Sequence, residues 1–226
     1  MTKEASLKLT LSEGPSVSAR WTESHAGTDV QWACVYAPGA GSNLDDPFGR
    51  FLAQELARVG IATLHFQFPY MEGKRRGPDR PPVLESTWRA AIAEASQHQP
   101  HLLIGGRSMG GRIASQVAAR EQGIDALALF AYPLHPPGRS EATRVAHLPS
   151  IAVPTLFCSG TRDAFGTPAE LAAAISLVPT AQLHLMDGAD HGFAVLKSSG
   201  RTRTEVYAEA VQATLDWLNS GSISAI

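Results

Sequence analysis

The feature that most constrains the fold of this chain is a regular alternation of short apolar runs with longer stripes of helical spacing. Short apolar runs bounded by turn residues predict strands, and apolar residues three and four positions apart predict helices. The predicted strands are 7–11, 17–21, 30–37, 61–68, 101–105, 126–131, 155–159 and 181–186. The predicted helices cover 46–59, 84–95, 110–121, 167–174 and 207–218.

This alternation predicts the fold class. Strands that alternate with helices form a mostly parallel sheet that helices cover on both faces. The first two strands are joined by a short turn at Gly14-Pro15, so they must run antiparallel. We therefore expect an α/β fold with an eight-stranded, mostly parallel sheet and an antiparallel N-terminal strand. The 226 residues suit a single domain, residues 1–226, because no repeat or linker divides them.

Charge and composition narrow the functional classes. The formal net charge is −2, whereas nucleic-acid binding requires a basic surface, so we expect no nucleic-acid partner. Cys34 and Cys158 lie inside apolar runs and are expected to be reduced core residues. The first eleven residues have no signal-peptide core, and no apolar run is long enough to span a membrane. These features predict a cytoplasmic protein, and they leave the oligomeric state open.

A motif that carries chemistry lies between a predicted strand and a predicted helix. Gly106-Arg107-Ser108-Met109-Gly110 has the form G-x-S-x-G, and it follows the apolar run Leu102–Ile104. Such a sharp strand-to-helix turn lifts a serine hydroxyl above the sheet, and its glycines let neighbouring elements approach. The start of the helix adds free N–H groups and the positive end of a dipole. We expect Ser108 to be a nucleophile. The alternative is a glycine-rich connection between strand and helix in which the serine is incidental.

A serine hydroxyl needs a base, and in this arrangement the acid and then the histidine follow the serine along the chain. His184 falls within the last predicted strand, where a packed or surface role is expected. His191 lies just past that strand, in the loop where a base could reach Ser108. The chain order therefore favours His191 as the base.

The acid is expected at the carboxyl end of the preceding strand. Asp163 lies there, after Gly160-Thr161-Arg162. Asp187 and Asp190 are alternatives, but both follow the last strand and are expected to be turn or cap residues. The acid orients the imidazole and stabilises its charged form. Asp163 is our candidate for this role.

A tetrahedral intermediate needs two hydrogen-bond donors for its oxyanion. One is expected to be the backbone N–H of Met109, directly after the serine, and the other to come from the loop after the third strand. That loop is Pro38-Gly39-Ala40-Gly41-Ser42-Asn43, and we favour the N–H of Ala40, with Gly39 and Gly41 as alternatives. Arg112 is expected to hold a neighbouring loop through Asp45 or Asp46.

These motifs resemble the α/β-hydrolase superfamily over nearly the whole chain. The narrower resemblance is to small dienelactone-hydrolase-like proteins that include testis-expressed relatives. The residues that carry it are Gly39–Asn43, Phe66–Tyr70, Gly105–Arg112 and Gly188–Gly192. The resemblance implies a triad of Ser108, Asp163 and His191 and the hydrolysis of an ester-like bond. Pro38 stands where many relatives have a histidine, and Ser108 stands where a dienelactone hydrolase proper has a cysteine.

Two further segments bear on the substrate. Only residues 132–154 separate the sixth and seventh strands, and this proline-rich stretch is too short for a helical lid, so we expect an open site. Lys74, Arg75, Arg76 and Arg80 cluster after the fourth strand, where they could recognise an acidic substrate. Because Glu72 and Asp79 are interleaved with them, a solvated loop is the simpler interpretation.

The sequence thus favours a serine hydrolase that cleaves a carboxylic ester, or a thioester, of a small or exposed acyl group. A non-catalytic interaction module with the same fold is the alternative, because a fold does not determine a function. The chain has no CxxC pair, HExxH motif, P-loop or dinucleotide fingerprint, so no metal and no organic cofactor is predicted.

Overall fold

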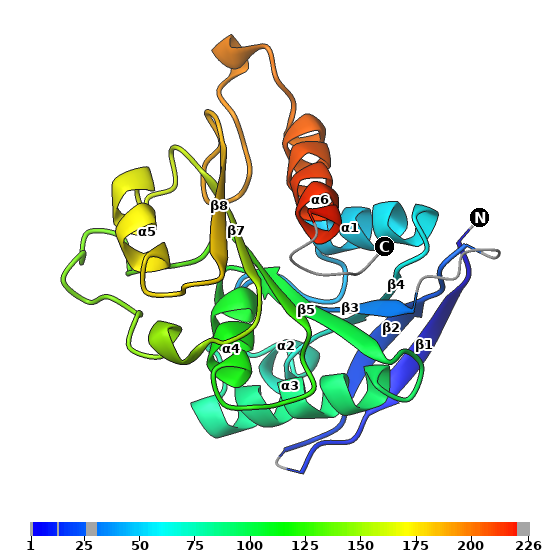
Figure 1. The fold of residues 1–226 in the computed structure, drawn as a ribbon. Helices are drawn as coiled ribbons and strands as arrows, with labels where there is room; N and C mark the ends of the chain where they lie inside the picture. Colours follow the sequence, from blue (N-terminus) through cyan, green and yellow to red (C-terminus); the bar gives the residue numbers. More distant parts are fainter. Residues whose placement is uncertain (1, 13, 26–30, 221–226) are drawn as a thin grey trace.

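The computed structural model describes residues 2–12, 14–25 and 31–220, which fold around one sheet with helices on both faces (Figure 1). The strands are β1 (Glu4–Leu9), β2 (Val17–Thr22), β3 (Trp32–Ala37), β4 (Ala62–Phe66), β5 (His101–Arg107), β6 (Ala126–Phe130), β7 (Thr155–Gly160) and β8 (Ala181–Met186). The helices are α1 (Pro47–Arg58), α2 (Pro69–Glu72), α3 (Pro81–Ala95), α4 (Met109–Ala118), α5 (Pro168–Ile175) and α6 (Arg203–Asn219). Two 3₁₀ turns complete the described elements, η1 (Leu148–Ser150) and η2 (Lys197–Ser199).

The sheet has the strand order β1-β2-β4-β3-β5-β6-β7-β8. β2 runs antiparallel to both of its neighbours, and the remaining pairs are parallel. The predicted mostly parallel eight-stranded sheet with an antiparallel N-terminal strand is therefore confirmed. In register, Ala37 of β3 lies beside Gly106 of β5, and Arg107 lies beside Phe130 of β6. The loops that follow these three strands consequently converge at one edge of the sheet, which is where ligands bind in such sheets.

Apolar residues pack on both faces of the sheet. One core cluster lies beneath α3, α4 and α5 and includes Trp88, Ile113 and Leu171. The other lies beneath α1 and α6 and includes Phe48 and Leu218. Figure 1 shows α1 and α6 on one side of the sheet and α3 and α4 on the other. The central strands β3, β4, β6 and β7 are buried along their whole length, as strands between two helical layers must be.

Local signals explain several of the helix starts. The Asp46 side chain accepts a hydrogen bond from the N–H of Gly49, and proline follows at the first helical position of α1. Thr167 and Glu170 form a capping box at the start of α5. Thr202 and Glu205 form another capping box at the start of α6.

Two expectations about secondary structure were incomplete. The predicted strand 61–68 ends at Phe66, and the predicted loop that follows contains the helix α2. α2 has only four residues, so it leaves no periodic apolar pattern in the sequence. The first residue of the predicted third strand, Val30, lies outside the described residues.

Both cysteines are buried and free, Cys34 in β3 and Cys158 in β7. Burial raises the pKa of the Cys34 thiol to about 12, and burial also raises the pKa of Cys158. Both thiols are therefore protonated at neutral pH and do not compete with a serine nucleophile. In the part of the chain that the structure describes, no helix has the length and apolarity needed to cross a bilayer.

His65 links folding stability to pH. It is fully buried in β4, at an edge-on ring contact with Tyr36. Burial lowers the pKa of His65 from 6.5 to about 4. At a pH between these two values His65 is therefore protonated in the unfolded chain and neutral in the folded chain. Stability is therefore fully present above about pH 6.5 and falls as the pH drops towards 4, by about 1 kcal/mol per pH unit from this one group.

We expect His65→Leu to flatten this dependence. Urea unfolding from about pH 7 to about pH 5 would measure it, because the free energy of unfolding of the wild type should fall more steeply than that of the variant. Part of the slope should remain in both proteins, since burial also lowers the pKa of His147 to about 4. Equal slopes in the two proteins would contradict the assignment to His65.

Candidate active site

Ser108 occupies the sharp turn between β5 and α4 that the sequence predicts. Its backbone has φ 53° and ψ −120°, which is a strained conformation for a residue with a side chain. Hydrogen bonds hold the turn on both sides: Ser108 N–H donates to Phe130 O over 2.8 Å, and Arg112 N–H donates to Ser108 O over 2.9 Å. The strain is thus maintained by the sheet on one side and by the helix on the other.

The two glycines of the motif permit a close approach of β3. A Cβ added to Gly106 would lie 2.4 Å from the carbonyl oxygen of Ala37, and one added to Gly110 would lie 2.3 Å from the same atom. No side chain can be accommodated at such distances without movement of the backbone. The glycines therefore bring the loop that follows β3 against the turn that carries Ser108.

His191 lies beside Ser108 although 83 positions separate them in the chain. Nε2 of His191 is 2.8 Å from Oγ of Ser108. The Asp190 side chain shapes the histidine loop, since its Oδ1 accepts hydrogen bonds from the N–H groups of Gly192 and Ala194. Asp190 is therefore a turn residue, as the sequence suggests.

Asp163 follows β7 and faces the other ring nitrogen of His191. Nδ1 of His191 lies 2.8 Å from Oδ2 and 3.0 Å from Oδ1 of Asp163. The Asp163 side chain has no exposed surface, whereas that of His191 is 23% exposed. Oδ1 of Asp163 also accepts a hydrogen bond from Phe165 N–H over 2.8 Å. A buried carboxylate requires partners of this kind, and here they orient it towards the imidazole.

The structure thus brings Ser108, His191 and Asp163 into one chain of hydrogen bonds and leaves Asp187 out of it. Oδ1 of Asp187 instead accepts a hydrogen bond from Thr161 Oγ1 over 3.3 Å. His184 is likewise outside this chain, and its Nε2 lies 3.0 Å from a carboxylate oxygen of Glu209.

Phe165 contacts the same histidine, which the sequence does not predict. Its ring stacks on the imidazole of His191, with centroids 3.9 Å apart and planes 24° apart. Phe165 is therefore joined to the acid through its backbone and to the base through its ring. The only signal in the sequence is its place two residues after Asp163, which does not by itself indicate a contact.

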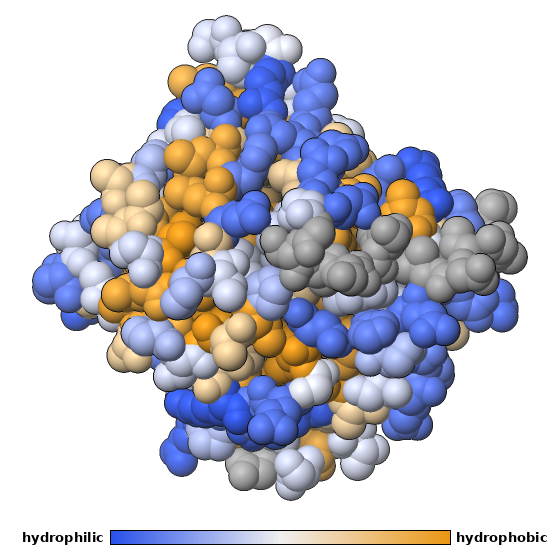
Figure 2. Space-filling view, in the orientation of Figure 1, coloured by the Kyte–Doolittle hydropathy of each residue, from blue (hydrophilic) through white to orange (hydrophobic). Residues whose placement is uncertain are grey.

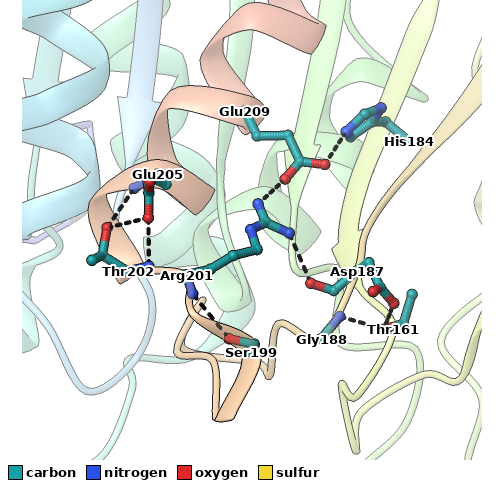
Figure 3. A network of polar contacts seen from close by, with 9 residues as sticks. All are labelled: Thr161, His184, Asp187, Gly188, Ser199, Arg201, Thr202, Glu205 and Glu209. Carbon is teal, nitrogen blue, oxygen red and sulfur yellow. Dashed lines mark hydrogen bonds and ion pairs between the residues drawn. The ribbon is translucent and has the colours of Figure 1, made fainter. Parts of the chain in front are cut away.

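The loop that bears His191 is closed by a polar network at its base (Figure 3). Thr161 Oγ1 accepts a hydrogen bond from Gly188 N–H over 2.8 Å, where the loop leaves β8. Arg201, where the loop returns, donates to the carbonyl of Asp187 over 3.0 Å and pairs with Glu209 of α6. Figure 3 shows that these groups tie the two ends of the loop to β7, β8 and α6. The position of His191 therefore depends on contacts well outside the loop.

Ala40 and Met109 are the predicted donors to an oxyanion. Met109 is the first residue of α4, where N–H groups have no partner inside the helix. A Cβ added to Gly39, which precedes Ala40, would lie 3.4 Å from Cβ of Ser108, so this loop passes directly beside the serine. The Tyr70 hydroxyl donates to the carbonyl oxygen of Ala40 over 2.8 Å and steadies the loop.

A buried ion pair connects this loop to the serine turn. Arg107 Nη2 lies 3.2 Å from Oδ1 of Asp46, which has no exposed side-chain surface. The same carboxylate accepts hydrogen bonds from Ser42 Oγ over 3.0 Å and from Tyr36 Oη over 2.7 Å. The expectation that Arg112 would hold Asp45 or Asp46 was wrong. Arg107 binds Asp46 because it is the residue of β5 adjacent to the loop.

Asp45 binds a different arginine. Arg20 of β2 lies 3.2 Å from its Oδ1. Arg112 is one turn into α4, where burial lowers its pKa. The two acidic residues of this loop are therefore both occupied by other cations.

The connection between β6 and β7 leaves the site open. Among residues 131–154 the only helical element is η1, which has three residues. The absence of a lid domain, which the short proline-rich segment predicts, is confirmed for this connection.

On the face seen in Figure 2, hydrophobic residues reach the surface near β8, where a groove of about 420 Å³ lies between β8 and α6. Among the described residues, no group of three His, Cys, Asp or Glu side chains could hold a metal ion.

The sheet order, the strained serine turn and the hydrogen-bonded histidine and aspartate define the class of α/β hydrolases. A family model described as an alpha/beta hydrolase domain matches residues 30–219. The chain belongs to this family of α/β-hydrolase domains.

Solved structures support the fold. The chain is similar to an α/β serine hydrolase without a lid from Xanthomonas campestris, with 18% identity, a TM-score of 0.72 and 96% of each chain covered. It is also similar to a dienelactone hydrolase from Anabaena variabilis, with 20% identity, a TM-score of 0.74 and coverage of 96% of this chain and 97% of that one. An α/β serine hydrolase homologue from Coxiella burnetii has 21% identity and a TM-score of 0.72, over 94% of this chain and 98% of the other.

One further similarity is confined to a short stretch of the sequence. Over 78 residues the chain is 44% identical to the polyketide synthase ThaQ of Burkholderia thailandensis. The match spans 34% of this chain and only 3% of that much longer protein.

Proposed function

We propose that this chain is a serine hydrolase that cleaves carboxylic esters or thioesters through an acyl-enzyme. The observation that carries the proposal is the chain of hydrogen bonds from Ser108 Oγ through His191 to the buried carboxylate of Asp163. A serine hydroxyl is a poor nucleophile without a base, and a neutral imidazole whose other nitrogen is held by a carboxylate is such a base.

In this mechanism Ser108 Oγ attacks the carbonyl carbon while Nε2 of His191 takes the hydroxyl proton. The resulting oxyanion accepts hydrogen bonds from the N–H groups of Met109 and Ala40. The intermediate collapses to an acyl-Ser108 ester as the imidazolium returns its proton to the leaving alcohol or thiol. Water then attacks the acyl-enzyme with His191 as base, and the acid product leaves. Asp163 holds the imidazole in one tautomer and stabilises its charged form.

A fluorophosphonate reagent tests the proposal because it reacts with activated serines. One adduct per chain is expected, and peptide mapping should place it on Ser108. The reagent should also abolish the hydrolysis of nitrophenyl esters. Stable labelling of another serine with Ser108 intact would overturn the assignment. An unreactive Ser108 in a folded chain without esterase activity would favour a non-catalytic interaction module.

The open site predicts a preference for short acyl groups. A long acyl chain would remain in water along most of its length, and each methylene would gain little of the ~0.8 kcal/mol that burial provides. We therefore expect kcat/KM to stop rising beyond short acyl groups such as acetyl or butyryl in a series of nitrophenyl esters below their critical micelle concentrations. Activation at a lipid–water interface should also be absent. A steady rise of kcat/KM to long chains would contradict this prediction.

A further inference from the structure

A pocket next to the proposed oxyanion loop carries the basic cluster that the function leaves unused. It has a volume of about 350 Å³, which is the size of a small-molecule site. One wall is residues 40–43 of the loop after β3, and the other is formed by Tyr70, Met71 and the three consecutive cations Lys74, Arg75 and Arg76. None of the described residues that line it has a carboxylate. Its positive charge is local, because the chain as a whole has a net charge of −2.

The two walls of this pocket are joined beside the reactive serine. Tyr70 donates its hydroxyl proton to the carbonyl of Ala40 and so connects the cationic wall to the loop. That loop passes Ser108 at Gly39, as the 3.4 Å approach of an added Cβ indicates. Ala40, which lines the pocket, therefore directly follows the residue that contacts Ser108.

The neighbouring acidic side chains pair with cations other than Lys74 and Arg76. Asp79 pairs with Arg75 and accepts a hydrogen bond from Tyr70 N–H over 2.7 Å. Glu72 pairs with Lys8 over 2.7 Å and accepts a hydrogen bond from Ser18 N–H. Lys74 and Arg76 have no ion-pair partner among the described residues. Two cations in this wall are consequently available to a ligand.

The backbone presents these cations in a defined position. Lys74 N–H donates to Met71 O over 3.0 Å and Arg75 N–H donates to Tyr70 O over 2.8 Å, which is the pattern that ends a helix with one left-handed residue. That residue is usually glycine, but here it is Lys74, with φ 52°. The basic segment therefore begins with a hydrogen-bonded turn, and the exposure of Lys74 and Arg76 agrees with the solvated loop that the sequence favours.

We propose that this pocket binds an anionic group of the substrate, a carboxylate or a phosphate, through Lys74 and Arg76. The proposal rests on the hydrolase function above, since it places the anion on a molecule whose ester lies at Ser108. Arginine and lysine together suit both kinds of oxyanion. The pocket then selects acidic esters over neutral esters of equal size.

Two pairs of esters test the selection, one with the anion on the acyl side and one with it on the alcohol side. The first pair is mono-(4-nitrophenyl) terephthalate and its methyl ester, and the second is 4-acetoxybenzoate and its methyl ester. In each pair the carboxylate is too far from the ester for intramolecular catalysis. The quantity compared between proteins is the ratio of kcat/KM for the anionic ester to kcat/KM for its neutral partner. The difference in intrinsic reactivity between the two esters is the same for every protein, so it does not affect this comparison.

The test variant is Lys74→Gly/Arg76→Gln, in which glycine suits the left-handed position and the turn is kept. The control is Arg58→Gln/Arg120→Gln, which removes two cations, one at the end of α1 and one just after α4. We expect the ratio for at least one pair to fall about tenfold in the test variant and to stay at the wild-type value in the control. The preference should also weaken between about 0.01 M and about 1 M salt, because the cations are exposed. Ratios that change in neither pair, or that change equally in the control, would overturn the proposal.

Calorimetric binding to the wild type and the test variant separates this proposal from the hydrolase function. The probes are benzoate, phenyl phosphate and the neutral benzyl alcohol. Both anions should bind the wild type more tightly than benzyl alcohol does, and this advantage should disappear in the test variant. The tighter of the two anions identifies the carboxylate or phosphate class. Anion binding without ester cleavage would retain the pocket and reject the hydrolase, whereas cleavage of the neutral esters without any anion preference would reject the pocket alone.

Discussion

Replacing Ser108 with alanine is expected to lower kcat for nitrophenyl ester hydrolysis by a factor on the order of 10⁶, the scale measured when a serine-protease triad loses its nucleophile. In the proposed mechanism the variant loses the atom that forms the acyl-enzyme, while the proposed oxyanion donors, the N–H groups of Met109 and Ala40, are retained. Some turnover above the uncatalysed rate should therefore remain. Steady-state kinetics, with the purified variant checked for contaminating esterase, would measure the loss.

Folding should be preserved in Ser108→Ala. Alanine also has a Cβ and so keeps the backbone strain at φ 53°, and the Ser108 N–H and carbonyl hydrogen bonds to Phe130 and Arg112 do not involve the side chain. The melting temperature is expected to stay close to that of the wild type. A variant that is folded and retains most of its activity would show that the hydrolysis occurs elsewhere.

Asp163→Asn is expected to cost on the order of 10⁴ in kcat, by analogy with the same change in a measured triad. An asparagine amide can donate to Nδ1 of His191, and the imidazole would then carry its proton on Nε2. In that tautomer Nε2 cannot accept the proton of Ser108. The rate loss should appear in kcat for the whole ester series and should leave the position of fluorophosphonate labelling unchanged, although labelling would be slower.

Asp190→Asn is the matched control for this prediction. Asp190 is adjacent to the histidine, but its Oδ1 only accepts hydrogen bonds from the N–H groups of Gly192 and Ala194, which an amide oxygen can also accept. We expect its kcat to change far less than that of Asp163→Asn. A larger loss in Asp190→Asn than in Asp163→Asn, with both proteins folded, would assign the acid to Asp190.

The sequence predicted the parts of the site that depend on chain order and local pattern. Ser108 was recognisable because an apolar strand, a glycine-flanked turn and a helix follow one another directly. Asp163 and His191 are candidates because each lies just after a recognisable strand, and parallel strands end at the same edge of a sheet. The lidless connection followed from the length and prolines of residues 132–154.

The sequence did not predict the side-chain contacts between distant segments. Arg107 and Arg112 both flank the serine turn, and no pattern along the chain distinguishes them as partners for Asp46. The structure distinguishes them because β5 places Arg107 beside the loop after β3, whereas α4 places Arg112 near Arg144 and Tyr132. The stacking of Phe165 on His191 and the bond from Tyr70 to Ala40 are of the same kind.

The basic segment after β4 shows most clearly which properties follow from the sequence and which depend on the tertiary structure. Its composition, with Glu72 and Asp79 among the cations, predicts mutual neutralisation in a solvated loop. Asp79 does pair with Arg75 in the same segment, but Glu72 pairs with Lys8 of β1, and Lys74 and Arg76 lie at a pocket beside the proposed oxyanion loop. The sequence by itself determined the order of strands and helices and the turn at Ser108, because these depend on propensities within a few residues. Only the tertiary structure decided that Glu72 pairs with Lys8 and that Lys74 and Arg76 line a pocket with the loop after β3, because these contacts depend on distances that packing sets between segments far apart in the chain.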